Sequence, residues 1–239
     1  MKDKSRPKVV YSRIGVEQPY AEVWDIQKHL QQQIIQRKRT GYKEHPGYLL
    51  ICEHSPVYTI GKSGNIDHLM LTEEQVEEAG FSFFKINRGG DITYHGPGQL
   101  TVYPILDLDQ FYNDVHRYVR DLEEVIIRVL SSYNIKGARV EGYTGVWIVD
   151  ELGRRKICAI GVHMSRWVSI HGLAFNINTH LDHFDNIIPC GIQDKDTSVT
   201  SLSVELGIEV SLEEVIERVK IEFSEVFNYD YVQLDQSIS

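Results

Sequence analysis

Hydrophobic residues recur at helical spacing in two long parts of the chain. The clearer pattern runs from Asp114 to Tyr133, where apolar residues return every three or four positions along one face. A second pattern runs from Tyr20 to Lys38 and ends in basic residues, which suit the negative end of a helix dipole. The spacing therefore predicts two long helices, each with one apolar face against the core.

Two further helices are predicted from the residues that start them. Thr72 and Gln75 fit a capping box at the start of one helix, and Gly80 is placed to end it. The other helix runs from Ser211 to about Phe227 and has the same capping pattern at its first turn. Both predictions rest on local hydrogen-bonding chemistry as much as on hydrophobic spacing.

Short apolar runs bounded by turn residues predict the strands. They cover residues 47–54, 55–62, 81–86, 100–106, 140–149, 156–163 and 168–178, with a shorter candidate at 9–11. The runs at 156–163 and 168–178 are predicted to pair as antiparallel neighbours. Residues 180–200 are irregular and polar, and the chain after Phe227 has no assignment. Because strands outnumber helices without strict alternation, the predicted class is α+β, with a mostly antiparallel or mixed sheet packed against helices.

Composition narrows the functional classes. The chain has 239 residues and a formal net charge of −9, which argues against nucleic acid as a partner. No apolar run approaches the roughly 20 residues of a membrane helix, and the charged N-terminus lacks an apolar signal core. Three cysteines do not suggest a disulfide framework. We expect one cytoplasmic domain over residues 1–239, with neither a nucleic acid nor a membrane as partner.

Basic residues gather in two places despite the acidic total. They are Lys2, Lys4, Arg6 and Lys8 at the start of the chain, and Arg37, Lys38, Arg39 and Lys43 at the end of the first predicted helix. The default interpretation of both groups is solvated surface. The alternative is that they dock an acidic partner.

The segment from Arg88 to Gln99 lies between two predicted strands and contains four glycines and one proline. Glycine allows close approach of a ligand to the backbone and takes dihedral angles that a Cβ forbids. The segment therefore predicts a conformationally special loop held over a site, with a functionless glycine-rich hairpin as the alternative. Its spacing matches neither the phosphate-binding loop nor the dinucleotide fingerprint.

Cys190 is the cysteine whose setting suggests chemistry. Pro189 and Gly191 flank it in the irregular segment, whereas Cys52 and Cys158 lie inside apolar strand patterns typical of inert, buried thiols. A thiol needs a nearby base or cation to react readily at neutral pH. Lys156, at the start of an apolar strand, is a candidate for that cation, with a solvated surface lysine as the alternative.

The sequence does not favour a metal site. Its potential ligands would be His163, His171, His180, Asp182, His183, Asp185 and Cys190. Their spacing matches no standard zinc pattern. We expect neither a bound metal nor a cofactor.

The assembled motifs resemble the lipoyl(octanoyl) transferase family. Residues 88–99 look like its R-G-G-x-x-T-[YF]-H-x-P-G-Q signature, and residues 53–61 resemble its E-H-x-P-V-[YF]-T-x-G segment. Further matches are Thr144–Trp147 with T-G-V-W, Lys156–Gly161 with K-I-x-x-[IL]-G, His171–Asn176 with H-G-x-A-x-N, and Pro189–Gly191 with P-C-G. The motifs occur in family order in a core of about 45–200, followed by the helix at about 211–227.

The resemblance implies a fold and a reaction. The fold would be that of biotin and lipoate protein ligase catalytic domains, a large mixed sheet flanked by helices with a smaller sheet. The reaction would move an octanoyl or lipoyl group from acyl carrier protein to a lysine of a lipoyl domain, the first step of endogenous protein lipoylation. The acceptors would be the E2 subunits of 2-oxo acid dehydrogenases and the H protein of glycine cleavage.

The resemblance also implies roles for individual residues. Cys190 would be the nucleophile that carries the acyl group, and Lys156 would lower the pKa of its thiol and move protons. The substrate-binding residues would be Arg88, Gly89, Gly90, Asp91, Ile92, Thr93, Tyr94, His95, Ala159, Ile160, Gly161, Gly172, Leu173 and Ala174.

Two other functions are kept as alternatives. An ATP-dependent lipoate ligase on the same fold would need ATP and a free fatty acid and would not need Cys190. A carrier-binding protein without activity would form no acyl-enzyme.

Overall fold

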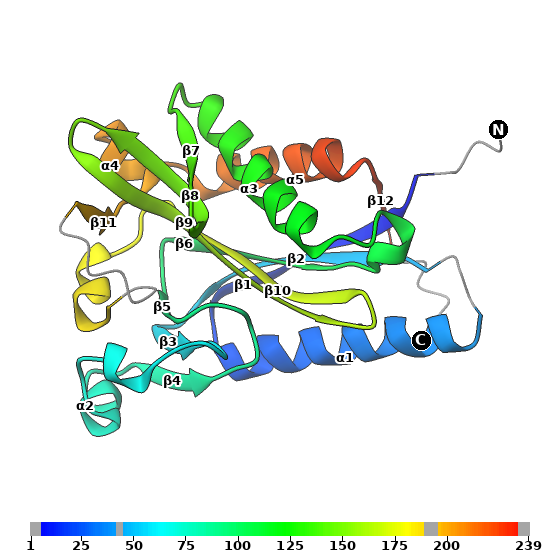
Figure 1. Cartoon of the computed structure of the whole chain (residues 1–239), viewed down its shortest axis with the longest axis horizontal. Coiled ribbons are helices and arrows are strands. Elements are labelled where there is room, and N and C mark those ends of the chain that lie inside the picture. The colour runs from blue at the N-terminus through cyan, green and yellow to red at the C-terminus, as the bar shows by residue number, and fades with distance from the viewer. Residues whose placement is uncertain (1–5, 42–44, 189–195, 234–239) are drawn as a thin grey trace.

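The computed structural model describes residues 6–41, 45–188 and 196–233, which form a large sheet, a small sheet and the helices around them (Figure 1). The large sheet of the described residues has nine strands. Their order is β12 (Asp230–Val232), β1 (Lys8–Gln18), β2 (Gly47–His54), β6 (Gln99–Ile105), β10 (Val168–Asn176), β9 (Gly153–Ser165), β8 (Tyr143–Asp150) and β7 (Gly137–Val140), with β11 (Thr197–Val199) beside β9. β1 runs parallel to β2 and β12, and β11 runs parallel to β9, while the other neighbours are antiparallel. The sheet is therefore mixed, as predicted.

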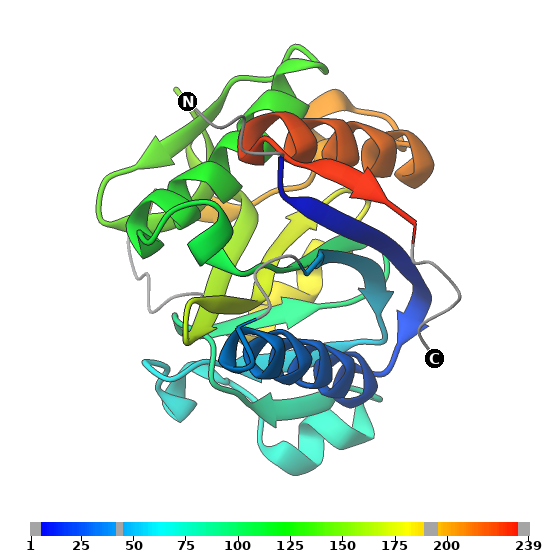
Figure 2. The same ribbon diagram turned by 90° about the vertical axis from the view of Figure 1, so that its right-hand side faces the viewer.

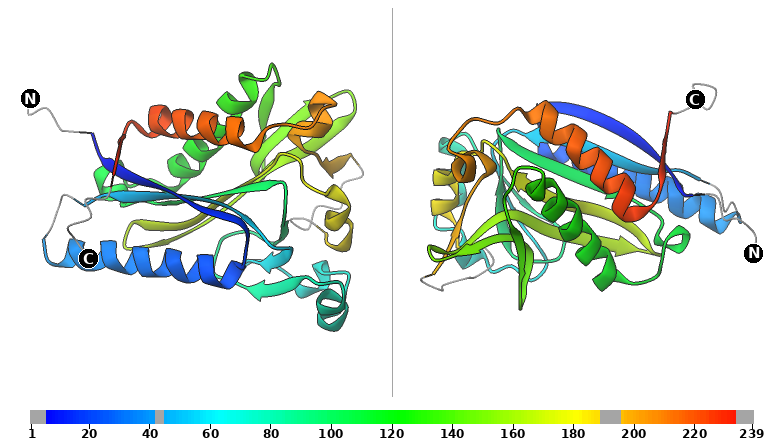
Figure 3. Two further views of the ribbon diagram at one scale, coloured as in Figure 1. Left: turned by 180° about the vertical axis from the view of Figure 1, so that it is seen from behind. Right: turned by 90° about the horizontal axis from the view of Figure 1, so that it is seen from above.

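Helices cover both faces of this sheet. α3 (Val115–Ser131) and α5 (Leu212–Phe227) lie on one face, and α1 (Tyr20–Arg39) lies on the other, so that the sheet is the middle layer (Figures 1 and 3). β2 shows why the sequence allows this. Leu49 and Ile51 pack into the core under α3 and α5, while Leu50 and Cys52 point to the core under α1. Burial on both faces explains the unbroken apolar run in this strand.

The small sheet has the order β4 (Ser82–Lys85), β3 (Val57–Ile60) and β5 (Ile92–His95) and lies beside the start of α1 (Figures 1 and 2). α2 (Glu73–Glu78) and the 3-10 turns η1 (Ile66–His68) and η3 (Leu181–Asn186) complete this part. The predicted capping box of Thr72 and Gln75 is present at the start of α2. A large mixed sheet with flanking helices and a smaller sheet confirms the predicted fold class.

The prediction that the whole segment from Arg88 to Gln99 is a loop is wrong. Its middle, Ile92–His95, is strand β5, which pairs with β3 in antiparallel register. The two strands around the segment do not form a hairpin either, because β4 belongs to the small sheet and β6 to the large one. The segment is therefore the connection between the two sheets.

Other elements differ from the prediction in their extent. β1 is longer than the strand expected at 9–11, and residues 137–150 form two paired strands, β7 and β8, in place of one. β11, β12, η3 and α4 (Leu202–Leu206) were not predicted. None of the helices in the described ranges is long and apolar enough to span a membrane.

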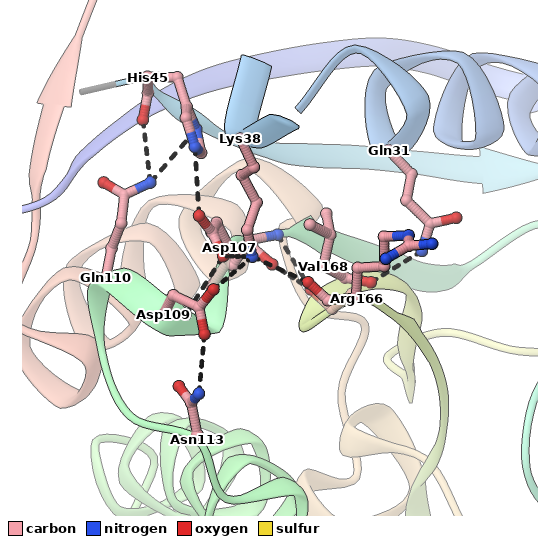
Figure 4. A network of polar contacts seen from close by, with 11 residues as sticks. Gln31, Lys38, His45, Asp107, Asp109, Gln110, Asn113, Arg166 and Val168 are labelled. Carbon is pink, nitrogen blue, oxygen red and sulfur yellow. Dashed lines mark hydrogen bonds and ion pairs between the residues drawn. The ribbon is translucent and has the colours of Figure 1, made fainter. Parts of the chain in front are cut away.

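Several basic residues that the sequence predicts to be solvated form ion pairs in the structure. Arg6 and Lys8 pair with Asp230, which ties β1 to β12. Lys38, at the end of α1, contacts Asp107 and Asp109 beside η2 (Leu108–Gln110) and donates to the carbonyl oxygen of Arg166 at 2.8 Å (Figure 4). Lys2, Lys4 and Lys43 lie outside the described residues.

The turn between β9 and β10 is held by these contacts. Arg166 and Trp167 both take left-handed backbone angles, with φ of 49° and 65°, although neither is glycine. The N–H of Leu108 donates to the carbonyl oxygen of Trp167 at 2.8 Å, next to the bond from Lys38 to Arg166. Hydrogen bonds at both carbonyls stabilise a two-residue turn that its own sequence disfavours.

The contacts of Asp107 with Lys38 and His45 should make a pH-dependent contribution to stability. Burial alone would raise the pKa of Asp107, but hydrogen bonds from His45 and Lys38 outweigh it and hold that pKa below its ordinary value. A carboxyl group with a lowered folded pKa stabilises the fold above its unfolded pKa of about 3.9, and the effect is lost as the pH falls through the folded value.

We expect Asp107→Asn to lower the free energy of unfolding by about 1–3 kcal/mol at pH 7, measured by urea titration. The loss should be smaller at pH 3, where the wild-type carboxyl group is itself being protonated. Asp109→Asn is the matched control, because that side chain is 43% exposed and its ion pair contributes about 1 kcal/mol or less. Equal losses for the two variants would contradict this assignment.

Candidate active site

A cavity of about 690 Å³ lies where the small sheet meets β9 and β10. The described residues of the predicted site that line it are Arg88, Gly89, Gly90, Asp91, Ile92, Thr93, His95, Lys156, Ala159, Ile160, Gly161, Gly172, Leu173 and Ala174. They come from three separate parts of the sequence. The fold thus brings together all the predicted site residues that it describes, except Tyr94.

Arg88 lies buried at the wall of the cavity. Its Nη2 donates to the carbonyl oxygen of Thr59 at 2.7 Å and to the hydroxyl of Thr59 at 3.1 Å, while its Nη1 donates to the carbonyl oxygen of Gly89 at 3.1 Å. The N–H of Gly89 donates to the carbonyl oxygen of Val162 on β9 at 2.9 Å. These bonds attach the connection between the sheets to both of them and fix the guanidinium in place.

Two glycines allow close backbone approach beside the cavity, Gly161 to the connection and Gly172 to β6. Gly161 and Gly172 are direct partners in the register of β9 and β10. A Cβ at position 161 would lie 2.8 Å from the carbonyl oxygen of Gly89, and one at position 172 would lie 2.1 Å from the carbonyl oxygen of Val102. Both distances are shorter than a carbon–oxygen contact allows, so close backbone approach requires glycine at both positions.

Three buried histidines at or near the cavity, His54, His95 and His171, have lowered pKa values. Burial lowers the pKa of His54 to about 4, and burial together with the nearby Arg88 cation lowers that of His171 to about 3. Burial, then His54 and Arg88, holds the pKa of His95 well below its ordinary value. At neutral pH these rings are therefore hydrogen-bonding groups and not cations.

Tyr94 points away from the cavity, unlike its neighbours in the motif. Its hydroxyl lies 2.8 Å from Nδ1 of His183, and its ring packs against Phe184. The hydroxyl of Tyr58 donates to the carbonyl oxygen of His183 at 2.8 Å. Tyr94 therefore lies behind the cavity and supports η3, whose Phe184 is part of the lining, while its neighbours Thr93 and His95 point to the other face of β5.

Lys156 lies on β9 at the cavity and is 6% exposed. Its Nζ lies 4.6 Å from the centre of the Trp147 ring, a cation–π distance. The backbone of Lys156 pairs with β11, and its carbonyl oxygen accepts from the N–H of Thr200 at 2.9 Å. The alternative of a solvated surface lysine is therefore wrong.

Cys190 lies outside the described residues. The described residues on either side of 189–195 are Ile188 and Asp196. The N–H of Ile188 donates at 2.8 Å to the carbonyl oxygen of His68, which lines the cavity. The carbonyl oxygen of Asp196 accepts at 2.9 Å from the N–H of Arg154, two residues before Lys156.

The other two cysteines are buried, as predicted. Burial raises the pKa of Cys52 to about 12 and raises that of Cys158 further. Cys158 packs in the core under α3, and the thiol of Cys52 lies 3.1 Å from the hydroxyl of Thr101. A thiol with a raised pKa is a poor nucleophile at neutral pH.

Sequence reasoning missed several residues that line the cavity. They are Tyr20, Ser63, His68, Tyr103, Val115, Val119, Gly142, Tyr143, Thr144, Val162, His171, Asn176, Phe184 and Val199, together with Gln99 from the end of the glycine-rich segment. Thr144, His171, Asn176 and Gln99 belong to quoted motifs, so the motifs could have indicated them. Tyr20 and Tyr103 carry no motif and reach the cavity through the packing of α1 and β6.

Within the described part of the chain, no group of three or more His, Cys, Asp or Glu side chains is arranged to hold a metal ion. His180 and His183 lie close together, with ring centres 5.9 Å apart, but His183 is bound to Tyr94.

Comparison with known proteins identifies the family. Residues 19–224 match the lipoyl protein ligase A/B catalytic domain. An octanoyltransferase of Flavobacterium psychrophilum is 53% identical over 216 residues, which cover 87% of this chain and 92% of that protein. An octanoyltransferase of Christiangramia forsetii is 50% identical over 215 residues, which cover 87% and 91%. The chain belongs to the octanoyltransferases of this family. It is accordingly an enzyme of the acyltransferase class, and the predicted resemblance is confirmed.

Solved structures of lipoate protein ligases share the fold of this chain. A bi-partite lipoate protein ligase of Thermoplasma acidophilum superposes with a TM-score of 0.67 at 16% identity, covering 96% of this chain and 86% of that one. A lipoate-protein ligase A bound with ATP gives 0.67 at 15% identity, covering 95% and 88%. At such low identities the likeness shows the fold alone.

The close approach at Gly161 in this octanoyltransferase-family chain can be tested by adding one methyl group. We expect Gly161→Ala to lower the free energy of unfolding by about 1–3 kcal/mol, because the Cβ overlaps the backbone of the neighbouring connection. Gly89→Ala is the control, since the nearest atom to its Cβ would be 3.6 Å away, and it should change stability by about 0.5 kcal/mol or less. Thermal or urea unfolding measures both, and equal losses would contradict the packing described.

Proposed function

We propose that the chain transfers an octanoyl or lipoyl group from acyl carrier protein to a lysine of a lipoyl domain, through a thioester on Cys190. The observation that carries this proposal is the cavity, which has Lys156 in its wall and whose lining residue His68 accepts a hydrogen bond from Ile188, two residues before Cys190. The relatives named octanoyltransferase support the acyl group. The acceptors would be E2 subunits of 2-oxo acid dehydrogenases and the glycine cleavage H protein, in the first step of endogenous lipoylation.

The lining of the cavity suits a fatty chain. Ile92, Ile160, Leu173, Phe184 and Val199 present apolar surface, and the volume of about 690 Å³ is within the range of small-molecule sites. Each buried CH2 group contributes roughly 0.8 kcal/mol, so an eight-carbon chain supplies several kcal/mol of binding. The apolar wall supports an acyl group as the cargo.

The polar lining suits the reacting end of the donor. In the proposed first step, the Cys190 thiolate attacks the thioester carbonyl carbon, the bond from that carbon to the donor sulfur breaks, and the leaving thiolate takes a proton from Lys156. The Arg88 cation can offset the negative charge that develops on the carbonyl oxygen. A thioester is already activated, so the step needs no ATP.

The second step returns the enzyme to its starting state. The amine of the acceptor lysine attacks the carbonyl carbon of the acyl-enzyme, a C–N bond forms and the C–S bond to Cys190 breaks. Lys156, neutral after the first step, accepts the proton that the attacking amine loses, and the thiolate of Cys190 is restored beside the ammonium. One lysine thus serves as acid in one half of the cycle and as base in the other.

We expect the wild-type chain to gain the mass of one octanoyl group on Cys190 when mixed with octanoyl-acyl carrier protein. Cys190→Ser should lower transfer by about 10³-fold or more, and Lys156→Met by about 10²–10⁴-fold, because it removes the proton donor and acceptor. Intact-mass and peptide mass spectrometry locate the adduct. Cys158→Ala is the matched control and should keep it, since Cys158 is a buried core residue. Wild-type transfer by Cys190→Ser would overturn the acyl-enzyme.

The lipoate ligase alternative makes the opposite prediction about ATP. We expect transfer from octanoyl-acyl carrier protein at the same rate with and without ATP and magnesium. Free octanoate with ATP should give no octanoylated lipoyl domain, because the proposed mechanism has no step that activates a free acid. The assay follows the mass of the lipoyl domain. Product that requires ATP and forms equally well with Cys190→Ser would favour the ligase.

A further inference from the structure

A line of buried polar residues runs along the wall of the cavity, and Arg88, His95, Gln99 and Asn176 of this line belong to the lining. It leads from Arg88 through Thr59, His95, Gln99 and Asn176 to Thr200, and consecutive members are joined by hydrogen bonds of 2.8–3.3 Å. All six residues are buried. Such a line inside a protein is stabilising only if each group meets a partner of the right kind.

Backbone carbonyls fix the direction of both amides in this line. Nε2 of Gln99 donates to the carbonyl oxygen of Tyr94 at 3.1 Å, so its Oε1 must be the atom that faces His95. Nδ2 of Asn176 donates to the carbonyl oxygen of Thr200 at 2.9 Å, so its Oδ1 must face Gln99. Because a carbonyl can only accept, neither amide can be reversed without losing two hydrogen bonds.

The fixed amide of Gln99 determines the form of the His95 ring. Nδ1 of His95 lies 2.8 Å from Oε1 of Gln99 and must therefore carry the proton. Nε2 then has a lone pair and lies 3.3 Å from the hydroxyl of Thr59. That hydroxyl accepts from Arg88, so its own hydrogen is available to His95. The chain of donors thus runs from the guanidinium toward Asn176 through a single tautomer.

The far end of the line reaches the strand of Lys156. The carbonyl oxygen of Thr200 accepts a hydrogen bond from Asn176. The N–H of Thr200 donates to the carbonyl oxygen of Lys156 at 2.9 Å. The hydrogen-bonded line therefore connects Arg88 on one side of the cavity with the backbone of Lys156 on the other. Replacing Gln99 or Asn176 can therefore affect the positions of Arg88 and Lys156 without either residue contacting the reacting atoms.

We propose that Gln99 and Asn176 are positioning residues for acyl transfer, which hold His95 with its proton on Nδ1 and thereby hold Thr59 and Arg88 in their places at the cavity. The proposal rests on the proposed function for its effect on the reaction. The tautomer itself is independent of that function. Two measurements therefore test the two parts separately.

The first measurement is the nitrogen NMR spectrum of the ring in chain labelled with ¹⁵N-histidine. We expect His95 to show a protonated Nδ1 and an unprotonated Nε2 at pH 7, with its signals assigned by their absence in His95→Asn. In Gln99→Leu the proton should move in part or entirely to Nε2, which can then donate to Thr59. A protonated Nε2 in the wild type would overturn the assignment, and so would a His95 ring in Gln99→Leu whose proton remains entirely on Nδ1.

The second measurement is steady-state kinetics with octanoyl-acyl carrier protein. Gln99→Leu and Thr59→Val should lower kcat by a factor on the order of 10–100, with KM changed less than about threefold, because the groups that bind the acyl chain remain. Thr59→Ser keeps the hydroxyl and should stay within about threefold of the wild-type kcat.

The matched control is Gln31→Leu. Gln31 is also a buried glutamine whose amide donates to a backbone carbonyl, that of Val168, and it lies outside the cavity lining. It should lower stability and leave kcat unchanged. Wild-type kcat in Gln99→Leu, or equal kcat values for Thr59→Val and Thr59→Ser, would overturn the positioning role. If the wild-type chain transfers no octanoyl group, the proposed function fails, and the ring spectrum still decides the tautomer.

Discussion

The structure depends on two glycines that face each other across β9 and β10. Gly161 and Gly172 leave a flat patch in the sheet, where a side chain would meet the backbone of Gly89 or of Val102. The connection between the two sheets passes over Gly161, which places Arg88 at the cavity, while Gly172 allows the close approach of β10 to β6. A cavity in the middle of a close-packed protein requires such missing volume, because side chains elsewhere fill the space between layers.

The electrostatic character of the cavity follows from the same packing. Since the large sheet and the small sheet exclude water from His54, His95 and His171, these rings remain neutral at physiological pH. Each ring has its own hydrogen-bond partner: Tyr103 for His54, Gln99 for His95 and Asn87 for His171. Arg88 and Lys156 contribute basic side chains to the walls. A site of this kind suits a reaction in which negative charge develops on an oxygen or sulfur atom, because positive charge is held in place before the reaction begins.

Much of this was accessible from the sequence, and the exceptions have a common cause. The long helices, the buried strand β2 and the antiparallel pair of β9 and β10 carry strong periodic or local signals and were predicted. Strand β5 was missed because its partner β3 lies more than 30 residues away, and glycines on both sides resemble a loop. The local sequence cannot reveal the ion pairs of Lys38, because its partners Asp107 and Asp109 come from a distant part of the chain. Motif matching grouped the residues of the cavity, but it could not separate Tyr94, which supports η3, from Thr93 and His95, which line the wall.

The left-handed turn at Arg166 and Trp167 limits how the chain can vary in length. The turn sets the register of β9 and β10, and this register pairs Gly161 with Gly172. Inserting or deleting one residue in the turn would shift the register by one residue, so that side chains of one strand would point to the opposite face of the sheet. A bulky side chain would then occupy a position that only glycine fits. We therefore expect homologous chains to keep the length of this turn constant even where its residues differ.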